Sequence, residues 1–132
     1  MTTTQHIYVV DDEAPAREMV GDYLKLHGFD VTLCDGGASL RAAIARQSPD
    51  LIILDLNLPR RGGFDVLQTI RSKPSLVGVP VGILTSSDAV KDRHRIAVTG
   101  GELYIHKPPE LEDFLEQVGQ AVEDLLARRL RH

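Results

Sequence analysis

Five short apolar segments alternate with longer stretches whose apolar residues recur at helical spacing, and this alternation constrains the fold more than any other feature of the chain. The segment 51–55 (LIILD) is apolar almost throughout, as expected for a strand that is buried on both faces. Strands that alternate with helices form a parallel sheet with helices on both faces. We therefore predict an α/β fold, (βα)₅, with a doubly wound sheet whose strands are 6–10, 31–34, 51–55, 79–84 and 103–106.

The predicted helices follow the strands, and several carry end signals. Pro15 suits the first turn of the first helix and Gly28 suits its end. Gly62 and Gly63 are expected in a turn that needs positive φ. The predicted ranges are 14–27, 39–47, 64–71, 88–98 (the weakest pattern) and 110–129.

The last predicted helix is longer than its neighbouring strand. Its twenty residues would span about 30 Å, whereas a five-residue strand spans about 17 Å. We expect the sheet to leave part of its second half uncovered, and uncovered apolar residues at helical spacing favour an interface with a partner or with a second copy. A frayed, solvated terminus is the alternative. The residues concerned are Val122, Leu125, Leu126 and Leu130.

Composition narrows the class of protein. The length of 132 residues fits one domain, 1–132, and because the chain ends soon after the last helix we expect no output domain. The net charge of −4 argues against a nucleic-acid partner. No signal peptide or bilayer-spanning run is recognisable, so a cytoplasmic protein without a membrane partner is expected. Cys34, the single cysteine, excludes an internal disulfide.

Polar residues stand where the predicted strands end. Asp11 and Asp12 follow the first strand, Asp55 ends the third, Thr85 follows the fourth and Lys107 follows the fifth. Ligands of such folds bind at the carboxyl ends of the strands. If the first and third strands are neighbours, the three carboxylates crowd into one pocket, and Thr85 and Lys107 flank it.

Three neighbouring carboxylates do not readily stay ionised together, so either their pKa values rise or a cation binds among them. An all-oxygen set suits Mg²⁺ better than zinc. No glycine-rich phosphate loop follows the first strand, which counts against nucleotide or flavin binding. The alternative for Asp11 and Asp12 is that they cap the first helix.

Four segments at these strand ends, in order, resemble a known family. They are IYVVDDE (7–13), LIILDLNLPRRGG (51–63), GILTSS (82–87) and YIHKP (104–108). Over nearly its whole length the chain resembles the CheY-like receiver domains of two-component response regulators. The strand order 2-1-3-4-5 comes from this resemblance, since it is the known order of CheY itself.

The resemblance also implies roles for the acidic residues. Asp55 matches the aspartate that accepts a phosphoryl group. Asp12 matches a direct Mg²⁺ ligand, and Asp11 matches its partner, which usually acts through water. Asn57 matches the position whose backbone carbonyl binds the metal.

Residues of the fourth and fifth strand ends complete the implied site. Thr85 and Lys107 match the hydroxyl and ammonium that contact the phosphoryl group, and Tyr104 matches the aromatic switch position. A half-buried tyrosine without a switch role is the alternative for Tyr104. Pro108 matches a proline that typically follows a cis peptide bond. The switch would reshape the face made by the fourth helix, fifth strand and fifth helix, which then binds a downstream protein target.

The implied donor is a phosphohistidine on a sensor histidine kinase or a histidine phosphotransfer domain, and three other interpretations remain. A phosphatase of the haloacid dehalogenase type also uses an aspartate with Mg²⁺, but it needs a second aspartate where Asn57 stands. A pseudo-receiver would bind partners without being phosphorylated. The chain could also be the receiver part of a longer DNA-binding regulator.

Overall fold

The computed structural model describes residues 4–56, 62–85, 103–106 and 111–130, with side chains described for 4–56, 62–84 and 115–127. Five parallel strands form one sheet in the order β2-β1-β3-β4-β5. They are β1 (His6–Val10), β2 (Asp30–Cys34), β3 (Leu51–Asp55), β4 (Val81–Thr85) and β5 (Leu103–His106). The predicted parallel sheet and its strand order are confirmed. The bounds of β1, β3 and β5 are as predicted, β2 begins one residue earlier, and β4 covers 81–85 rather than 79–84.

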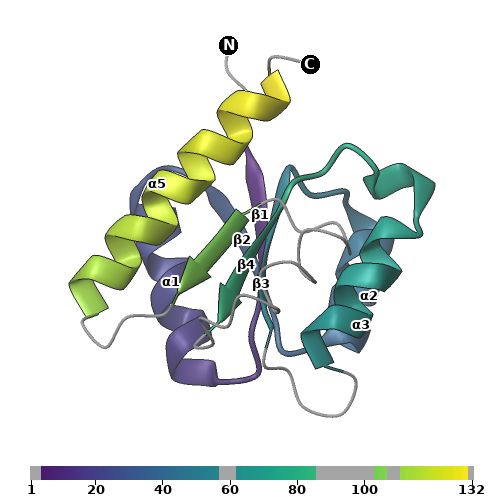
Figure 1. Ribbon diagram of the computed structural model, residues 1–132, viewed down its shortest axis with the longest axis horizontal. Helices are drawn as coiled ribbons and strands as arrows, with labels where there is room; N and C mark the ends of the chain where they lie inside the picture. The colour runs from purple at the N-terminus through teal and green to yellow at the C-terminus, as the bar shows by residue number, and fades with distance from the viewer. Residues whose placement is uncertain (1–3, 57–61, 86–102, 107–110, 131–132) are drawn as a thin grey trace.

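Helices cover both faces of the sheet (Figure 1), with α1 and α5 on one face and α2 and α3 on the other. Their bounds are α1 (Ala14–Leu26), α2 (Gly37–Arg46), α3 (Gly62–Arg71) and α5 (Leu111–Leu130), and a short 3₁₀ helix covers Pro74–Leu76. The helix predicted over 88–98 lies outside the described residues. Pro15 lies in the first turn of α1, and Gly28 follows its end with φ of 92°, as predicted.

Each face of the sheet has its own hydrophobic core, because side chains alternate along a strand. In β1, Tyr8 and Val10 belong to the core under α2 and α3, whereas Ile7 and Val9 belong to the core under α1 and α5. All five residues of β3 are buried, in agreement with its apolar sequence.

The prediction that the second half of α5 is left uncovered is wrong for the described residues. Val122, Leu125 and Leu126 are 0%, 1% and 5% exposed. They pack in the same core as Ile53 and Leu84, and α1 packs beside α5 on this face. Several strands and a neighbouring helix cover α5 together, so the length of one strand underestimates what can be buried. The side chain of Leu130 lies outside the described part.

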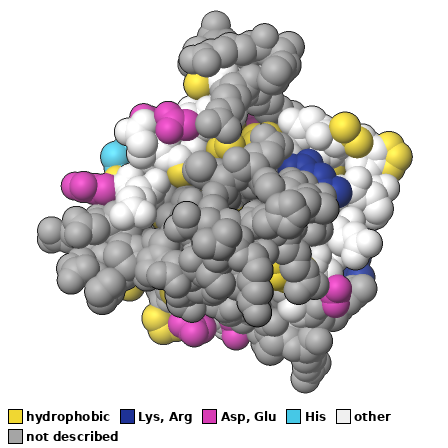
Figure 2. Space-filling model, viewed as in Figure 1, with side chains coloured by type: hydrophobic (Ala, Val, Ile, Leu, Met, Phe, Trp, Pro, Cys, Tyr) yellow, Lys and Arg dark blue, Asp and Glu magenta, His cyan; other side chains and the backbone are white. Residues whose placement is uncertain are grey.

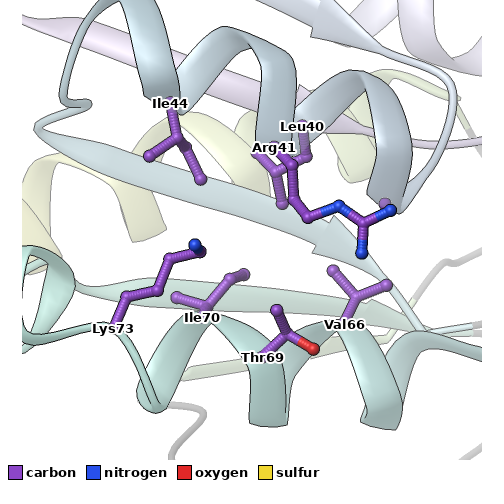
Figure 3. A pocket seen from close by; sticks show the side chains of 8 residues that line it. Leu40, Arg41, Ile44, Val66, Thr69, Ile70 and Lys73 are labelled. Carbon is purple, nitrogen blue, oxygen red and sulfur yellow. The ribbon is translucent and has the colours of Figure 1, made fainter.

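A narrow slot separates α2 from α3 (Figure 3). Leu40, Ile44, Val66 and Ile70 form its apolar walls, and Arg41 and Lys73 lie at its edges. The space inside is only about 10 Å³. A Cβ at Gly37 would meet Cγ2 of Val66 at 3.4 Å, which is an ordinary contact distance. The two helices are therefore nearly in full contact.

Tyr8 ties the sheet to the carboxyl end of α2. Its hydroxyl lies 3.1 Å from the carbonyl oxygen of Ala43 and also contacts that of Gln47, and the side chain is only 1% exposed. Burial is the main cause that raises the pKa of Tyr8 above its ordinary value. The phenol therefore acts as a hydrogen-bond donor to carbonyl oxygens at the carboxyl end of α2, where the Ala43 oxygen also accepts the N–H of Gln47 at 3.0 Å.

We expect Tyr8→Phe to lower the free energy of unfolding by about 1 kcal/mol, because buried carbonyls lose a donor. Urea titration followed by circular dichroism measures this. Tyr23→Phe, at a half-buried position on α1, is the control and should change stability less. Equal stability of Tyr8→Phe and wild type would contradict the anchoring role.

Candidate functional site

Three aspartates meet at the carboxyl edge of the sheet. Asp11 and Asp12 follow β1 directly and Asp55 is the last residue of β3, and these strands are neighbours in which Val10 lies opposite Leu54. Each aspartate offers a carboxylate oxygen, and the three oxygens lie within 4.8 Å of one another. The predicted crowding of these carboxylates is confirmed.

Backbone and side-chain hydrogen bonds fix Asp11, which is 1% exposed. Its N–H donates to the carbonyl oxygen of Cys34 at 3.0 Å, and its Oδ1 accepts the N–H of Glu13 at 3.0 Å. Glu13, the residue before α1, makes no side-chain capping bond. Asp11 therefore orders the turn into α1, in part agreement with the capping alternative, and still presents a carboxylate to the cluster.

Asp55 is held by the centre of the sheet and is 2% exposed. It lies opposite Leu84 of β4, and the next residue, Leu56, donates its N–H to the carbonyl oxygen of Leu84 at 2.8 Å. The N–H of Gly63 in turn donates to the carbonyl oxygen of Leu56 at 3.0 Å. The start of α3 is thus hydrogen-bonded to the residue that follows Asp55.

The two glycines at the start of α3 serve different purposes. Gly62 has φ of 73°, as predicted. Gly63 does not have positive φ, so that part of the prediction is wrong. Glycine is needed at this position because α3 approaches the backbone of Leu56 closely. A Cβ at Gly63 would lie 2.5 Å from both Cα and the carbonyl oxygen of Leu56.

The donor set fits a hard cation. It consists of three carboxylates without sulfur or imidazole ligands, as Mg²⁺ prefers. Asp12 is exposed whereas Asp11 and Asp55 are buried, so the cluster has one open side. This arrangement could bind a metal ion that keeps some of its water, which is how proteins usually hold Mg²⁺.

The other predicted site residues are only partly described. Thr85 ends β4 and pairs with His106, and Tyr104 lies on β5 opposite Ile83. The side chains of Thr85 and Tyr104 lie outside the described part, as do Asn57, Lys107 and Pro108 altogether. The structure therefore brings together the three aspartates, and the roles of the remaining residues stay predictions.

Two supports of the site were not expected from sequence. Nη1 of Arg17 reaches back from α1 and donates to the backbone carbonyl oxygen of Asp11 at 2.8 Å. Cys34 holds Asp11 through its carbonyl, and its thiol is buried as expected. Burial, followed by the charge of Asp35, raises the pKa of Cys34 to about 11. The thiol is therefore protonated and unreactive near neutral pH.

The fold and this acidic site define a receiver. The family described as "Response regulator receiver domain" matches residues 7–119. The chain belongs to this family. The resemblance inferred from the four sequence segments is confirmed.

Relatives among characterised proteins are longer than this chain. It is 42% identical over 107 residues to the probable transcriptional regulatory protein TcrX of Mycobacterium tuberculosis, which covers 81% of this chain and 45% of the relative. It is 34% identical over 117 residues to the DNA-binding response regulator MtrA of Mycobacterium bovis, and this match covers 89% of this chain and 50% of MtrA. The chain thus spans about half the length of these relatives. Because MtrA is a DNA-binding protein, the argument from net charge does not carry over to such longer proteins.

Solved structures support the fold class. The phosphorylated cyanobacterial phytochrome response regulator RcpA is similar with a TM-score of 0.84 and 27% identity, covering 96% of both chains. The Mn²⁺-bound form of the response regulator Rcp1 is similar with a TM-score of 0.79 and 29% identity, and the match covers 90% of this chain and 91% of Rcp1. CheY4 of Vibrio cholerae has a TM-score of 0.84 at 23% identity, and the match covers 93% of this chain and 99% of CheY4. At this identity the likeness shows the fold alone. Among the described helices, none is long and apolar enough to cross a bilayer.

We expect Gly63→Ala to destabilise the protein by about 1–3 kcal/mol, because the added methyl group collides with the backbone of Leu56. Thermal and urea unfolding measure the loss. Gly78→Ala is the control, since a Cβ at Gly78 meets no atom within 4 Å. The same stability for both variants would show that the close approach of α3 to Leu56 is not required.

Proposed function

We propose that this receiver takes a phosphoryl group onto Asp55 in a Mg²⁺-dependent reaction. The observation that carries the proposal is the cluster of Asp11, Asp12 and Asp55, whose carboxylate oxygens lie within 4.8 Å of one another at the ends of two adjacent strands. Membership of the receiver family supports it. The donor would be a phosphohistidine on a sensor histidine kinase or a histidine phosphotransfer domain.

The chemistry follows from the charges. A carboxylate oxygen of Asp55 forms a bond to phosphorus while the bond from phosphorus to the donor's imidazole nitrogen breaks, and the imidazole leaves with that electron pair. Mg²⁺, when bound, would supply positive charge that offsets the repulsion between the carboxylates and the phosphoryl oxygens. Asp11 and Asp12 would hold the ion, with the backbone carbonyl of Asn57 as a further ligand. Water later hydrolyses the acyl phosphate and regenerates Asp55.

The switch rests on residues assigned through the resemblance. The hydroxyl of Thr85 and the ammonium of Lys107 would contact the phosphoryl oxygens, since charge-assisted bonds to these oxygens are strong. Movement of Thr85 would leave space that Tyr104 can fill. The new charge thereby biases a two-state element whose altered face binds a downstream protein.

A second candidate function is control of transcription. TcrX is described as a probable transcriptional regulatory protein and MtrA as a DNA-binding response regulator, and the chain spans about half of each. In that case this receiver regulates a DNA-binding partner or segment rather than a separate signalling protein. Co-purification of DNA with the full gene product, dependent on phosphorylation, would favour this function, and its absence would favour protein targets alone.

Incubation with phosphoramidate and Mg²⁺ should add one phosphoryl group to the wild type and none to Asp55→Asn, as measured by intact-protein mass spectrometry. Asp35→Asn is a matched control, because Asp35 follows the end of β2 and should leave labelling unchanged. Labelling that persists in Asp55→Asn would assign the phosphoryl group to another residue. An unlabelled wild type would favour the pseudo-receiver.

Mg²⁺ should raise the melting temperature of the wild type and should be required for labelling. Asp12→Asn should reduce both effects, since an exposed ligand is lost, and should melt higher than wild type in chelator because one of three like charges is removed. Glu13→Gln, an exposed neighbour outside the cluster, serves as control. Equal responses of both variants to Mg²⁺ would exclude Asp12 as a ligand.

A further inference from the structure

A groove of about 280 Å³ lies between α1 and α5. Aromatic rings from α1 and the segment after it form one wall, through Tyr23, His27 and Phe29. The carboxylates of Glu116 and Glu123 come from α5. The volume lies just below the usual range for small-ligand sites, and it suffices for a large side chain with part of its backbone.

The aromatic wall is already in place. The rings of Tyr23 and His27 lie 4.5 Å apart between centroids with an interplanar angle of 48°. Gly119 of α5 lies against Tyr23, because a Cβ at this position would meet Cε1 at 3.0 Å and the hydroxyl oxygen at 3.1 Å. The close packing of these two helices therefore sets the position of the tyrosine ring.

The charge of the groove is negative. Glu116 and Glu123 are both exposed and, being seven residues apart, lie two helical turns or about 10.5 Å apart along the axis. The described lining includes no Lys or Arg. In the view of Figure 2 the visible Lys and Arg side chains lie on the right, in the half that carries α2 and α3 in Figure 1. The described lining therefore carries negative charge, which favours a cationic ligand.

The slot between α2 and α3 is a weaker candidate although Arg41 and Lys73 border it. Its space of about 10 Å³ is that of a single water, and its walls Leu40, Val66 and Ile70 are already buried. No side chain could enter without separating the helices. The groove between α1 and α5, in contrast, is open as it stands.

We propose that the groove between α1 and α5 binds a basic peptide segment of a partner protein through two arginines three residues apart. A peptide in the polyproline II conformation has three residues per turn and advances about 3.1 Å per residue. Arginines three residues apart then lie on one side about 9 Å apart, close to the axial separation of Glu116 and Glu123. A guanidinium can stack on the ring of Tyr23 and pair with a carboxylate in the same pose. The apolar stem of the arginine then covers the remaining aromatic surface.

This binding goes beyond the proposed phosphorylation and is separable from it. His27 and Phe29 precede β2, at the amino edge of a parallel sheet, whereas Asp55 ends β3 at the carboxyl edge. The groove and the acidic cluster therefore share no residue. Asp55→Asn should leave peptide binding unchanged, so failure of one proposal is distinguishable from failure of the other.

The test uses the whole chain and the peptide acetyl-Arg-Ala-Ala-Arg-amide, titrated by NMR. Shifts should concentrate at Tyr23, Glu116, Gly119 and Glu123. Glu116→Gln and Glu123→Gln should each weaken binding about threefold, a modest effect because exposed ion pairs contribute little. Tyr23→Leu should weaken it by a similar factor through loss of ring stacking. Asp65→Asn, which removes an exposed charge on α3, should have no effect.

Each alternative outcome would overturn the proposal in its own way. Equal weakening by Asp65→Asn would show attraction to overall charge rather than to the groove. Equal affinity for arginine amide alone would show a site for a small cation instead of a peptide. Equal affinity for acetyl-Glu-Ala-Ala-Glu-amide would remove the charge argument. Circular dichroism of each variant verifies that it folds.

Discussion

The parallel pairing of β1 with β3 is the constraint on which the site depends. Both strands are buried on both faces, and a shift of register by one residue would turn their core side chains the wrong way. The register that places Val10 opposite Leu54 also places Asp11 beside Asp55. Burial of apolar side chains therefore forces together two carboxylates that repel each other. At an effective dielectric constant of about 20, two unit charges less than 5 Å apart repel by about 3 kcal/mol or more.

The sequence predicts this part of the molecule well because strand ends in a parallel sheet meet at one edge. The apolar run 51–55 identifies a buried strand, and the aspartates at its end and after 6–10 then lie at the same edge of the sheet. That these two strands are neighbours came from the family resemblance and is confirmed by the strand order. Sequence predicts less where two backbones approach. Gly63 is needed because a Cβ at this position would lie 2.5 Å from the backbone of Leu56. The spacing of apolar residues in the sequence does not reveal this contact. The hydrogen bond from Arg17 to the carbonyl oxygen of Asp11 also cannot be predicted from residue spacing, because it depends on how α1 lies against the end of β1.

The error over α5 has a different physical origin. The length of α5 exceeds that of a single strand, but in the structure α5 packs on several strands and beside α1. Val122 and Leu125 are consequently among the most buried residues of the chain. What remains accessible on this layer is the polar and aromatic groove beside Tyr23 and Gly119. The surface of α5 in this groove is therefore charged rather than apolar, so the partner we propose is a basic segment rather than a protein or second copy bound through apolar residues.

The unequal burial of the three aspartates suggests how a cation and a phosphoryl group would enter the site. Asp11 and Asp55 are closed in by the sheet, and Asp12 is on the solvent side. Asp12 would therefore be the carboxylate of the cluster that a cation from solvent can contact most readily. In the proposed reaction, a phosphoryl group would approach a carboxylate that has two like-charged neighbours. Because each added negative charge increases the same repulsion, metal binding and phosphorylation at Asp55 are expected to be thermodynamically coupled, each strengthening the other.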